Sequence, residues 1–283
     1  MNKVVKVLLL GLVVLLFAGN SWAFSSFTWH LDTIGYTYTN VDGSGDTLDF
    51  DELVNLTNAG NFPVKSYVTQ DLGLDGVLSD GDTFTEFGAL NVVGVDSEAT
   101  FFNAEGNPAR IYYAFSGLSG SIDNVDLTNP AVPVYDINFN PGVGTIQLLY
   151  TDDLSLATFD GVIATFSLLE AGATGFELDE GAGLNSGFSF TLDMLSADVA
   201  GFWEFPLGLA EDLIAEGVGV QAFADLNANI LSIDGTVIEN SLLITVENSG
   251  TMRHDVVPEP STLLLLGAGL LGLGAVARRR NNN

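Results

Sequence analysis

The sequence predicts an all-β protein, with a β-sandwich or jelly-roll-like body between an N-terminal signal peptide and a short C-terminal hydrophobic helix. Apolar residues recur at every second position in short runs, which is the pattern of half-buried strands. Clusters of Gly, Asp, Asn and Pro separate these runs and are typical of turns. The chain is 47% hydrophobic, with 19 Phe and no Cys, so its stability must come from a packed core rather than disulfides.

The first residues have the three parts of a secretory signal peptide. Two lysines precede an apolar stretch at residues 7–18, and a small-x-small sequence ends at Ala23. We therefore predict export through the Sec translocon and cleavage by signal peptidase between Ala23 and Phe24. The alternative is an uncleaved N-terminal anchor. In both cases residues 1–23 are set apart from the fold.

The body is strongly acidic. Residues 24–257 hold three basic residues, Lys65, Arg110 and Arg253, against 35 acidic ones, which gives a net charge of −32. This charge argues against nucleic acid as a partner, because no basic patch is present to neutralise phosphates. It favours solubility and divalent cations as counter-ions.

Alternating runs divide residues 24–248 into short strands. Residues 51–58 fit either a strand or one helical turn, and the spacing of leucines at residues 207–216 predicts a short helix. Residues 249–257 are polar and precede a proline, so they are predicted to be a linker. The apolar positions of the alternating runs are Phe27, Trp29 and Leu31; Ile111, Tyr113 and Phe115; Tyr135, Ile137 and Phe139; Ile146, Leu148 and Tyr150; Val162, Ala164 and Phe166; Phe188, Phe190 and Leu192; Val218, Val220 and Ala222; and Leu242, Ile244 and Val246.

An acidic loop before residue 52 is a candidate calcium site. Oxygen donors stand at positions 1, 3, 5 and 12 of the loop, with Gly45 at position 6, as in an EF-hand-like loop. The alternative is an acidic hairpin turn. Two looser acidic groups are Asp75, Asp80 and Asp82, and Asp123, Asn124 and Asp126. The predicted calcium ligands are Asn40, Asp42, Ser44, Asp46 and Asp51.

The sequence offers no activated catalytic set, and we predict that the protein is not an enzyme. It has no cysteine nucleophile and no Gly-x-Ser-x-Gly elbow. Its two histidines are far apart, with His30 expected in the first strand and His254 expected in the linker. Paired carboxylates could serve a glycosidase, but nothing in the sequence selects a pair.

Four aromatic residues could stack on the rings of a polysaccharide. Trp29, Trp203, Tyr36 and Tyr38 are the candidates. The alternative is that they fill the core, as large aromatics do in β-sandwiches. We assign Trp203 to the core, because phenylalanines flank it.

The C-terminus has the layout of a membrane-targeting signal. The motif Pro258-Glu259-Pro260 is followed by an apolar run at residues 263–277 and then by Arg278, Arg279 and Arg280. The run of 15 residues contains several glycines, whereas a comfortable span needs about 20 residues. This favours a transient anchor. The three arginines are expected to stay in the cytoplasm, which places the body outside the inner membrane.

Residues 258–283 closely resemble the PEP-CTERM sorting signal of Gram-negative bacteria. The resemblance implies cleavage by an exosortase near Pro-Glu-Pro, after a transient stay in the inner membrane. The expected destination is the cell surface or the extracellular matrix, in exopolysaccharide, biofilm or floc formation, with exopolysaccharide as a further partner. The body resembles flocculation-associated PEP-CTERM proteins more loosely, through residues 80–88. A secreted carbohydrate-active enzyme with the same tag is the alternative.

Overall fold

Strands make up most of the residues that the computed structural model describes, which confirms the predicted all-β class. The structure describes residues 26–35, 47–50, 52–57, 63–95, 110–153, 155–179, 186–234 and 240–257. Its elements are β1 (Phe27–His30), the 3-10 helix η1 (Leu31–Ile34), β2 (Thr47–Phe50), β3 (Leu53–Thr57), β4 (Ser66–Asp71), β5 (Thr83–Asn91), β6 (Gly94–Val95), β7 (Arg110–Asp126), β8 (Val134–Phe139), β9 (Thr145–Thr151), β10 (Gly161–Glu177), β11 (Ser186–Ala197), β12 (Trp203–Phe205), β13 (Gly208–Leu209), α2 (Ala210–Ala215), β14 (Gly219–Asp234) and β15 (Ser241–Val257).

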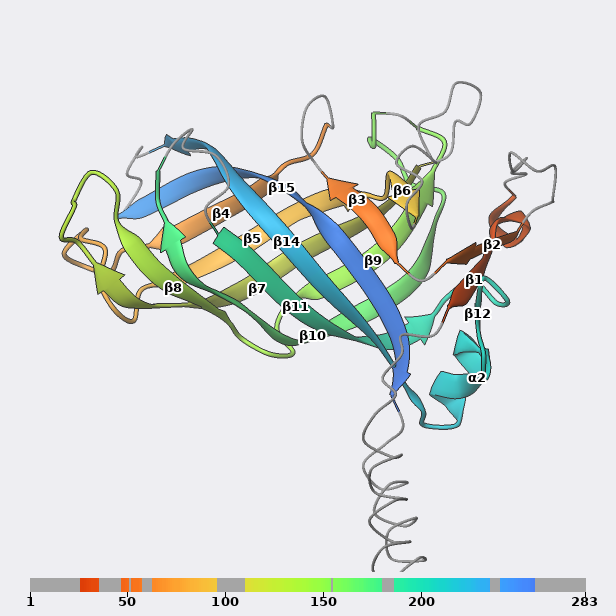
Figure 1. Ribbon diagram of the computed structural model, residues 1–283. Helices are drawn as coiled ribbons and strands as arrows, with labels where there is room; N and C mark the ends of the chain where they lie inside the picture. The colour runs from red at the N-terminus through yellow and green to blue at the C-terminus, as the bar shows by residue number, and fades with distance from the viewer. Residues whose placement is uncertain are drawn as a thin grey trace, which may run out of the picture.

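The large sheet has eleven strands and closes on itself (Figure 1). The circuit of antiparallel pairs runs β5, β4, β15, β14, β11, β10, β8, β7 and back to β5. Strand β3 continues the place of β4 against β15, and β9 continues the place of β8 between β7 and β10. The inner faces of opposite walls therefore pack together, as in a sandwich, although both walls belong to one sheet.

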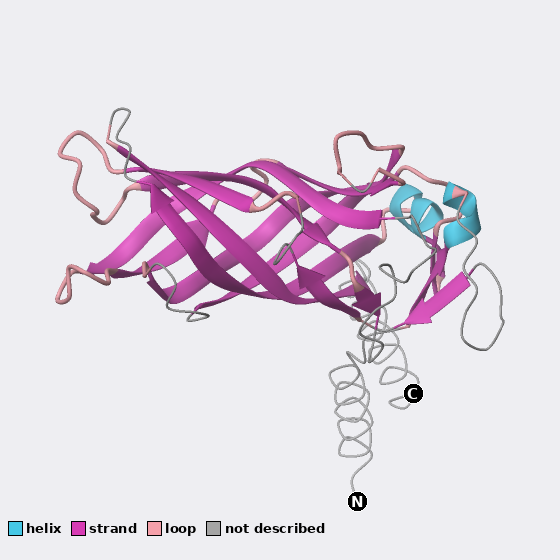
Figure 2. Cartoon of the chain, turned by 90° about the horizontal axis from the view of Figure 1, so that it is seen from above, coloured by secondary structure: helices cyan, strands magenta, loops and turns pink. Residues whose placement is uncertain are grey.

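The circuit has two distinct ends. Strands β4, β7, β10 and β14 end at one of them, and β5, β8, β11 and β15 begin there; we call it the hairpin end (Figure 1). A small sheet of order β13-β12-β1-β2 lies at the other, next to helix α2 (Figure 2). We call this the plugged end, because five aromatic side chains of the small sheet and its flank are buried there. They are Phe27, Trp29, Phe202, Trp203 and Phe205, each at most 2% exposed, and we call them the aromatic plug.

The alternation predicted for the long strand β7 is correct at its start and then shifts by one residue. Ile111 and Tyr113 are buried as predicted, but further along the strand Leu118 and Ile122 are the buried residues. The shift occurs at Gly117, whose φ of 66° lies in the left-handed region that glycine adopts without strain. Because of this bulge, β7 places apolar side chains in the interior both before and after Gly117, along its 17 residues.

The predicted linker at residues 249–257 is wrong, because these residues form the second half of β15. They pair with β14 up to the partners Val257 and Gly219. Met252, His254 and Val256 face the interior and are buried; of the two residues between them, Arg253 is partly exposed and Asp255 is buried at 7%. The polar composition that suggested a linker therefore belongs to one face of a strand.

The two uncertain segments resolve as a strand and a short helix. Residues 53–57 form β3, and the helix predicted at residues 207–216 is α2, Ala210–Ala215. Leu213 of α2 is buried, as its spacing indicated, whereas Leu209 precedes the helix as its N-cap.

Candidate functional site

The predicted sorting and cleavage residues lie outside the described residues. These are Ala23, Phe24, Pro258, Glu259, Pro260, Arg278, Arg279 and Arg280. The last described residue is Val257 at the end of β15, and Pro258 follows it directly in the sequence. In the part of the chain that the structure describes, no helix has the length and apolar character needed to cross a membrane.

The predicted calcium loop also lies outside the described residues, with all five ligands: Asn40, Asp42, Ser44, Asp46 and Asp51. The site stays a prediction. Calcium should raise the melting temperature more than sodium chloride of equal ionic strength does, because an ion that binds only the folded state adds stability by mass action. We expect an increment of roughly 5–10 °C at a calcium concentration about 100-fold above Kd.

The variant Asp42→Ala should lose this calcium-specific increment. The matched control is Asp32→Ala, which removes one charge from an exposed position of η1. Differential scanning calorimetry of the three proteins measures the effect. An equal calcium shift in wild type and Asp42→Ala would leave only diffuse screening and would rule out the loop.

The two looser acidic groups lie at the hairpin end and hold its loops together. The Asp82 carboxylate accepts a hydrogen bond from the Ser79 N–H at 2.8 Å, and Asp80 accepts one from the Val125 N–H at 2.8 Å. Asp126 accepts from Thr128, which lowers the pKa of this carboxyl. Among the residues that the structure describes, no three His, Asp or Glu side chains come together in a group that could hold a metal ion.

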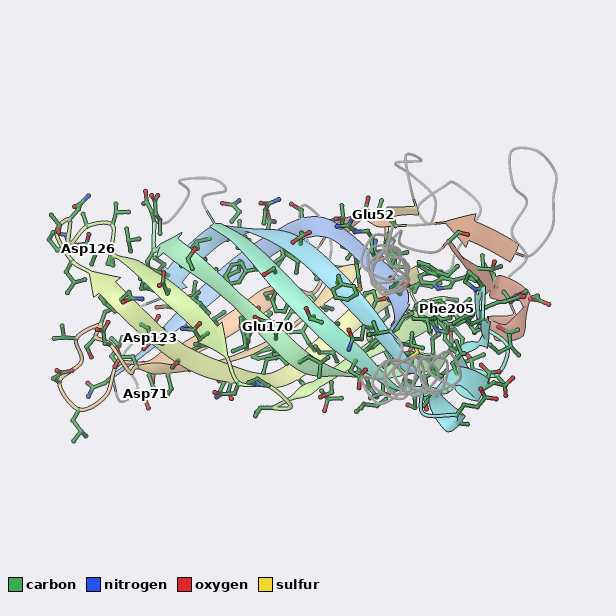
Figure 3. The ribbon with its side chains drawn as sticks, turned by 60° about the horizontal axis from the view of Figure 1, so that its bottom comes forward. Glu52, Asp71, Asp123, Asp126, Glu170 and Phe205 are labelled. Atoms are coloured by element: carbon green, nitrogen blue, oxygen red, sulfur yellow. The ribbon has the colours of Figure 1, made fainter. Side chains whose placement is uncertain are left out.

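Most charged residues at the hairpin end are nevertheless acidic. Figure 3 labels Asp71, Asp123 and Asp126 there, far from Phe205 at the plugged end. The sequence clusters Asp75, Asp80 and Asp82 belong to the β4–β5 connection and its edge. The molecule therefore presents a negatively charged face at the hairpin end.

The two tryptophans proposed as sugar platforms cannot stack on a polysaccharide, because both are 0% exposed. Trp29 and Trp203 are paired across β1 and β12, with ring centroids 5.2 Å apart in an edge-to-face arrangement. The assignment of Trp203 to the core is confirmed. Tyr36 and Tyr38 lie outside the described residues.

The histidines have different environments, and neither lies in a linker. His30 is on β1, as predicted, with Nε2 2.9 Å from a carboxylate oxygen of Glu204. His254 is on β15, 0% exposed, with its ring 4.7 Å from that of Trp203 and 5.0 Å from that of Phe27. Its Nε2 is 3.1 Å from the Tyr113 hydroxyl. Burial lowers the pKa of His254 to about 3, so this ring is neutral at physiological pH.

The interior of the closed sheet contains a cavity of about 80 Å³. Its lining comes from β4, β5, β7, β8, β9, β10, β11, β14 and β15, and is mostly Phe, Leu, Ile, Val and Ala. A closed sheet of eight positions has an interior that side chains just fill or that holds one small ligand. Here the fill is incomplete, which makes the cavity the strongest candidate binding site in the described chain.

Three polar side chains without aromatic rings face this cavity: Gln70, Glu86 and Asn248. They come from neighbouring strands, β4, β5 and β15. Gln70 is opposite Phe84, and Glu86 is the next inward residue along β5, so the two are diagonal neighbours. The Asn248 amide donates to the Ser66 hydroxyl at 2.6 Å.

Gln70 and Glu86 have unused hydrogen-bonding capacity. The Gln70 Nε2 is buried without a partner among the described residues, and Gln70 is 1% exposed. The Glu86 side chain also lines the cavity. Burial raises the pKa of Glu86 to about 8, so its carboxyl is mainly protonated at neutral pH and can donate a hydrogen bond.

Sequence reasoning missed this polar site although a signal was present. Phe84 and Glu86 alternate with Thr83, Thr85 and Phe87, so an apolar-face pattern that includes Phe84 places a glutamate in the interior. A charged residue at an apolar position of an alternating strand is the sequence signal that would have predicted this polar site. Phe87, in contrast, points outward and is 51% exposed, stacked on Tyr67.

Comparison with known families finds a match to the PEP-CTERM protein-sorting motif over residues 256–280. Searches of curated proteins and of solved structures found no match to the chain. The match confirms the sorting signal predicted from the C-terminal residues. It identifies the protein as exported through the membrane, with an exosortase as its processing partner. The match covers only the last two residues of β15 in the closed sheet, so the looser resemblance of residues 80–88 stays a prediction.

Proposed function

We propose that this exported chain is processed by exosortase and then acts at the cell surface or in the extracellular matrix as a non-catalytic component of exopolysaccharide, biofilm or floc. The observation that carries the proposal is the sorting motif at residues 256–280, which begins within the last residues of β15. A cut near Pro-Glu-Pro would remove the membrane anchor and leave every strand of the closed sheet intact. Processing would thus release a complete folded unit.

The negative charge of the body supports a role in a hydrated environment outside the cell. A net charge of −32 over residues 24–257 keeps copies of the protein apart and gathers divalent cations around it. Such cations can bridge an acidic protein to an acidic polysaccharide. The outer face of strands such as β14 carries Gln221, Asp225 and Asn227, which suits contact with water and sugar hydroxyls.

The placement of the histidines supports a non-catalytic role. His254 is a neutral ring enclosed by the aromatic plug, and His30 pairs with Glu204. Each has a structural partner that accounts for it. A secreted carbohydrate-active enzyme with the same tag remains the alternative, and the experiments below distinguish the two.

The processed protein should begin near Phe24 and end at residues 258–260. Replacing Pro258, Glu259 and Pro260 together with alanine should leave the chain in the inner membrane with its C-terminus intact, because the recognised motif is lost while the apolar run remains. The matched control replaces Asn281, Asn282 and Asn283 with alanine and should be processed normally. Cell fractionation and mass spectrometry of both termini measure the result. Finding residues 278–283 on released wild-type protein would contradict exosortase processing.

The same variants test the role in the matrix. A deletion strain complemented with wild-type protein should regain floc or biofilm mass, whereas the triple-alanine variant of the Pro-Glu-Pro motif should not. Purified protein should sediment with isolated exopolysaccharide without releasing reducing ends. Release of reducing ends in proportion to protein concentration would instead establish the enzyme.

A further inference from the structure

The interior cavity has the size of a small ligand. A space of about 80 Å³ holds on the order of six water molecules, since one water needs about 10–15 Å³ on this measure. Its walls include Phe84, Phe139, Phe188 and Phe190, which offer water few hydrogen bonds. A flexible apolar chain of about six to eight non-hydrogen atoms has a comparable volume and would recover contacts that the empty space forfeits.

The polar site on the β4–β5 wall restricts the head group of such a ligand. The Gln70 Nε2 is an unpaired donor, and the protonated Glu86 carboxyl is a second donor. An ammonium head has no lone pair for either donor. A carboxylate head would have to enter a body of net charge −32 and lose its hydration. An uncharged oxygen accepts from both donors at the lowest cost.

We propose that the cavity of the closed sheet binds one small, uncharged apolar molecule with an oxygen head, of the class of medium-chain alcohols, and that Gln70 and Glu86 hold the head. The chain of the ligand lies among the aromatic and aliphatic side chains of β7, β8, β11 and β14. This binding activity is separate from sorting and does not depend on the proposed role in the matrix.

The test is calorimetric titration of the processed protein, purified from cells, with 1-hexanol at pH 6.5. Hexanoate and hexylammonium have the same chain with an anionic and a cationic head. We expect one hexanol per protein, with both charged analogues at least tenfold weaker. Affinity should rise about fourfold for each methylene from butanol to hexanol and then level off when the cavity is full. No binding of hexanol, or tighter binding of either charged analogue, would overturn the proposal.

Variants locate the site. Gln70→Leu and Glu86→Leu should each weaken hexanol binding about three- to tenfold, because each removes one hydrogen bond to the head. Thr85→Leu is the matched control, since Thr85 neighbours Glu86 but points outward. Ala228→Leu fills the cavity from β14 and should abolish binding whatever the head group.

Folding is checked separately, so that an unfolded variant cannot mimic a lost site. Each variant is accepted only if its far-ultraviolet circular dichroism and cooperative melting match those of the wild type. Glu86→Gln serves as a second variant at the head position, because its amide keeps a donor and should keep hexanol binding within about threefold. Unchanged binding in Ala228→Leu would place the alcohol outside the cavity and refute the assignment.

Discussion

Replacing Glu86 with glutamine should stabilise the protein at neutral and alkaline pH and leave its stability at pH 4 unchanged. Burial raises the pKa of Glu86 to about 8, whereas the unfolded chain ionises this group near 4.5. Between these values the folded state holds more protons, so the free energy of unfolding falls as the pH rises. At pH 7 the cost is on the order of 3 kcal/mol. Glutamine does not ionise and avoids this cost.

Urea denaturation between pH 4 and pH 9 measures the effect. Glu170→Gln is the matched control, because Glu170 lies on the outer face of β10 and is exposed. It removes the same charge and relieves the same general repulsion within an acidic body. Equal gains in the two variants at pH 8 would contradict a buried Glu86 and point to net charge alone.

Replacing His254 with glutamine should remove an acid sensitivity of the wild-type protein. Burial lowers the pKa of His254 to about 3 from its ordinary value of 6.5. Below pH 6.5 the His254 ring binds a proton in the unfolded chain but not in the folded state. The free energy of unfolding therefore falls as the pH drops toward 3. The loss from this group is on the order of 3 kcal/mol at pH 4.

The surroundings of His254 explain its lowered pKa. Its Nε2 meets the Tyr113 hydroxyl, and its Nδ1 has no hydrogen-bond partner among the described residues, so an added proton would be buried without an acceptor. Glutamine can keep a bond to Tyr113 but does not titrate. The control is His30→Gln at a partly exposed position of β1. Parallel pH profiles for the wild type and His254→Gln would contradict this account.

These two buried groups act in opposite directions. Glu86 lowers stability as the pH rises above about 4.5, and His254 lowers it as the pH falls below about 6.5. The double variant should therefore have a flatter profile than either single one. A maximum of wild-type stability between these two values is the expected signature.

The class of fold could be predicted from the sequence because alternation is a local property. Phe27, Ile111 and Tyr113 were placed correctly on buried faces, since side chains of a strand must alternate whatever the sheet becomes. The closure of the sheet could not be predicted in this way. It depends on which strands pair over long distances, such as β5 with β7 and β4 with β15.

The errors have local physical reasons. Residues 249–257 carry polar groups on the outer face of β15, and the composition alone could not show that Met252 and Val256 alternate with them against a core. The binding site was missed because Glu86 is ordinary on a surface and unusual only in an interior. Alternation with Phe84 places Glu86 on the inward face, whereas its neighbours, such as Val68 opposite it on β4, follow from strand pairing that the local sequence does not show.

If the body is anchored through its C-terminus before the cut, as proposed, the position of Val257 orients it. β15 begins at the hairpin end and finishes at the plugged end, one residue before the sorting motif (Figure 1). A strand of 17 residues is roughly 55 Å long, and the usual tilt in a closed sheet leaves a height of roughly 40 Å. In such an anchored copy the aromatic plug would lie nearest to the membrane. The acidic tip, meaning the hairpin end with Asp71 and Asp126, would lie farthest from the lipid surface. Under the proposed sorting route, the acidic tip is therefore open to a partner before the cut releases the body.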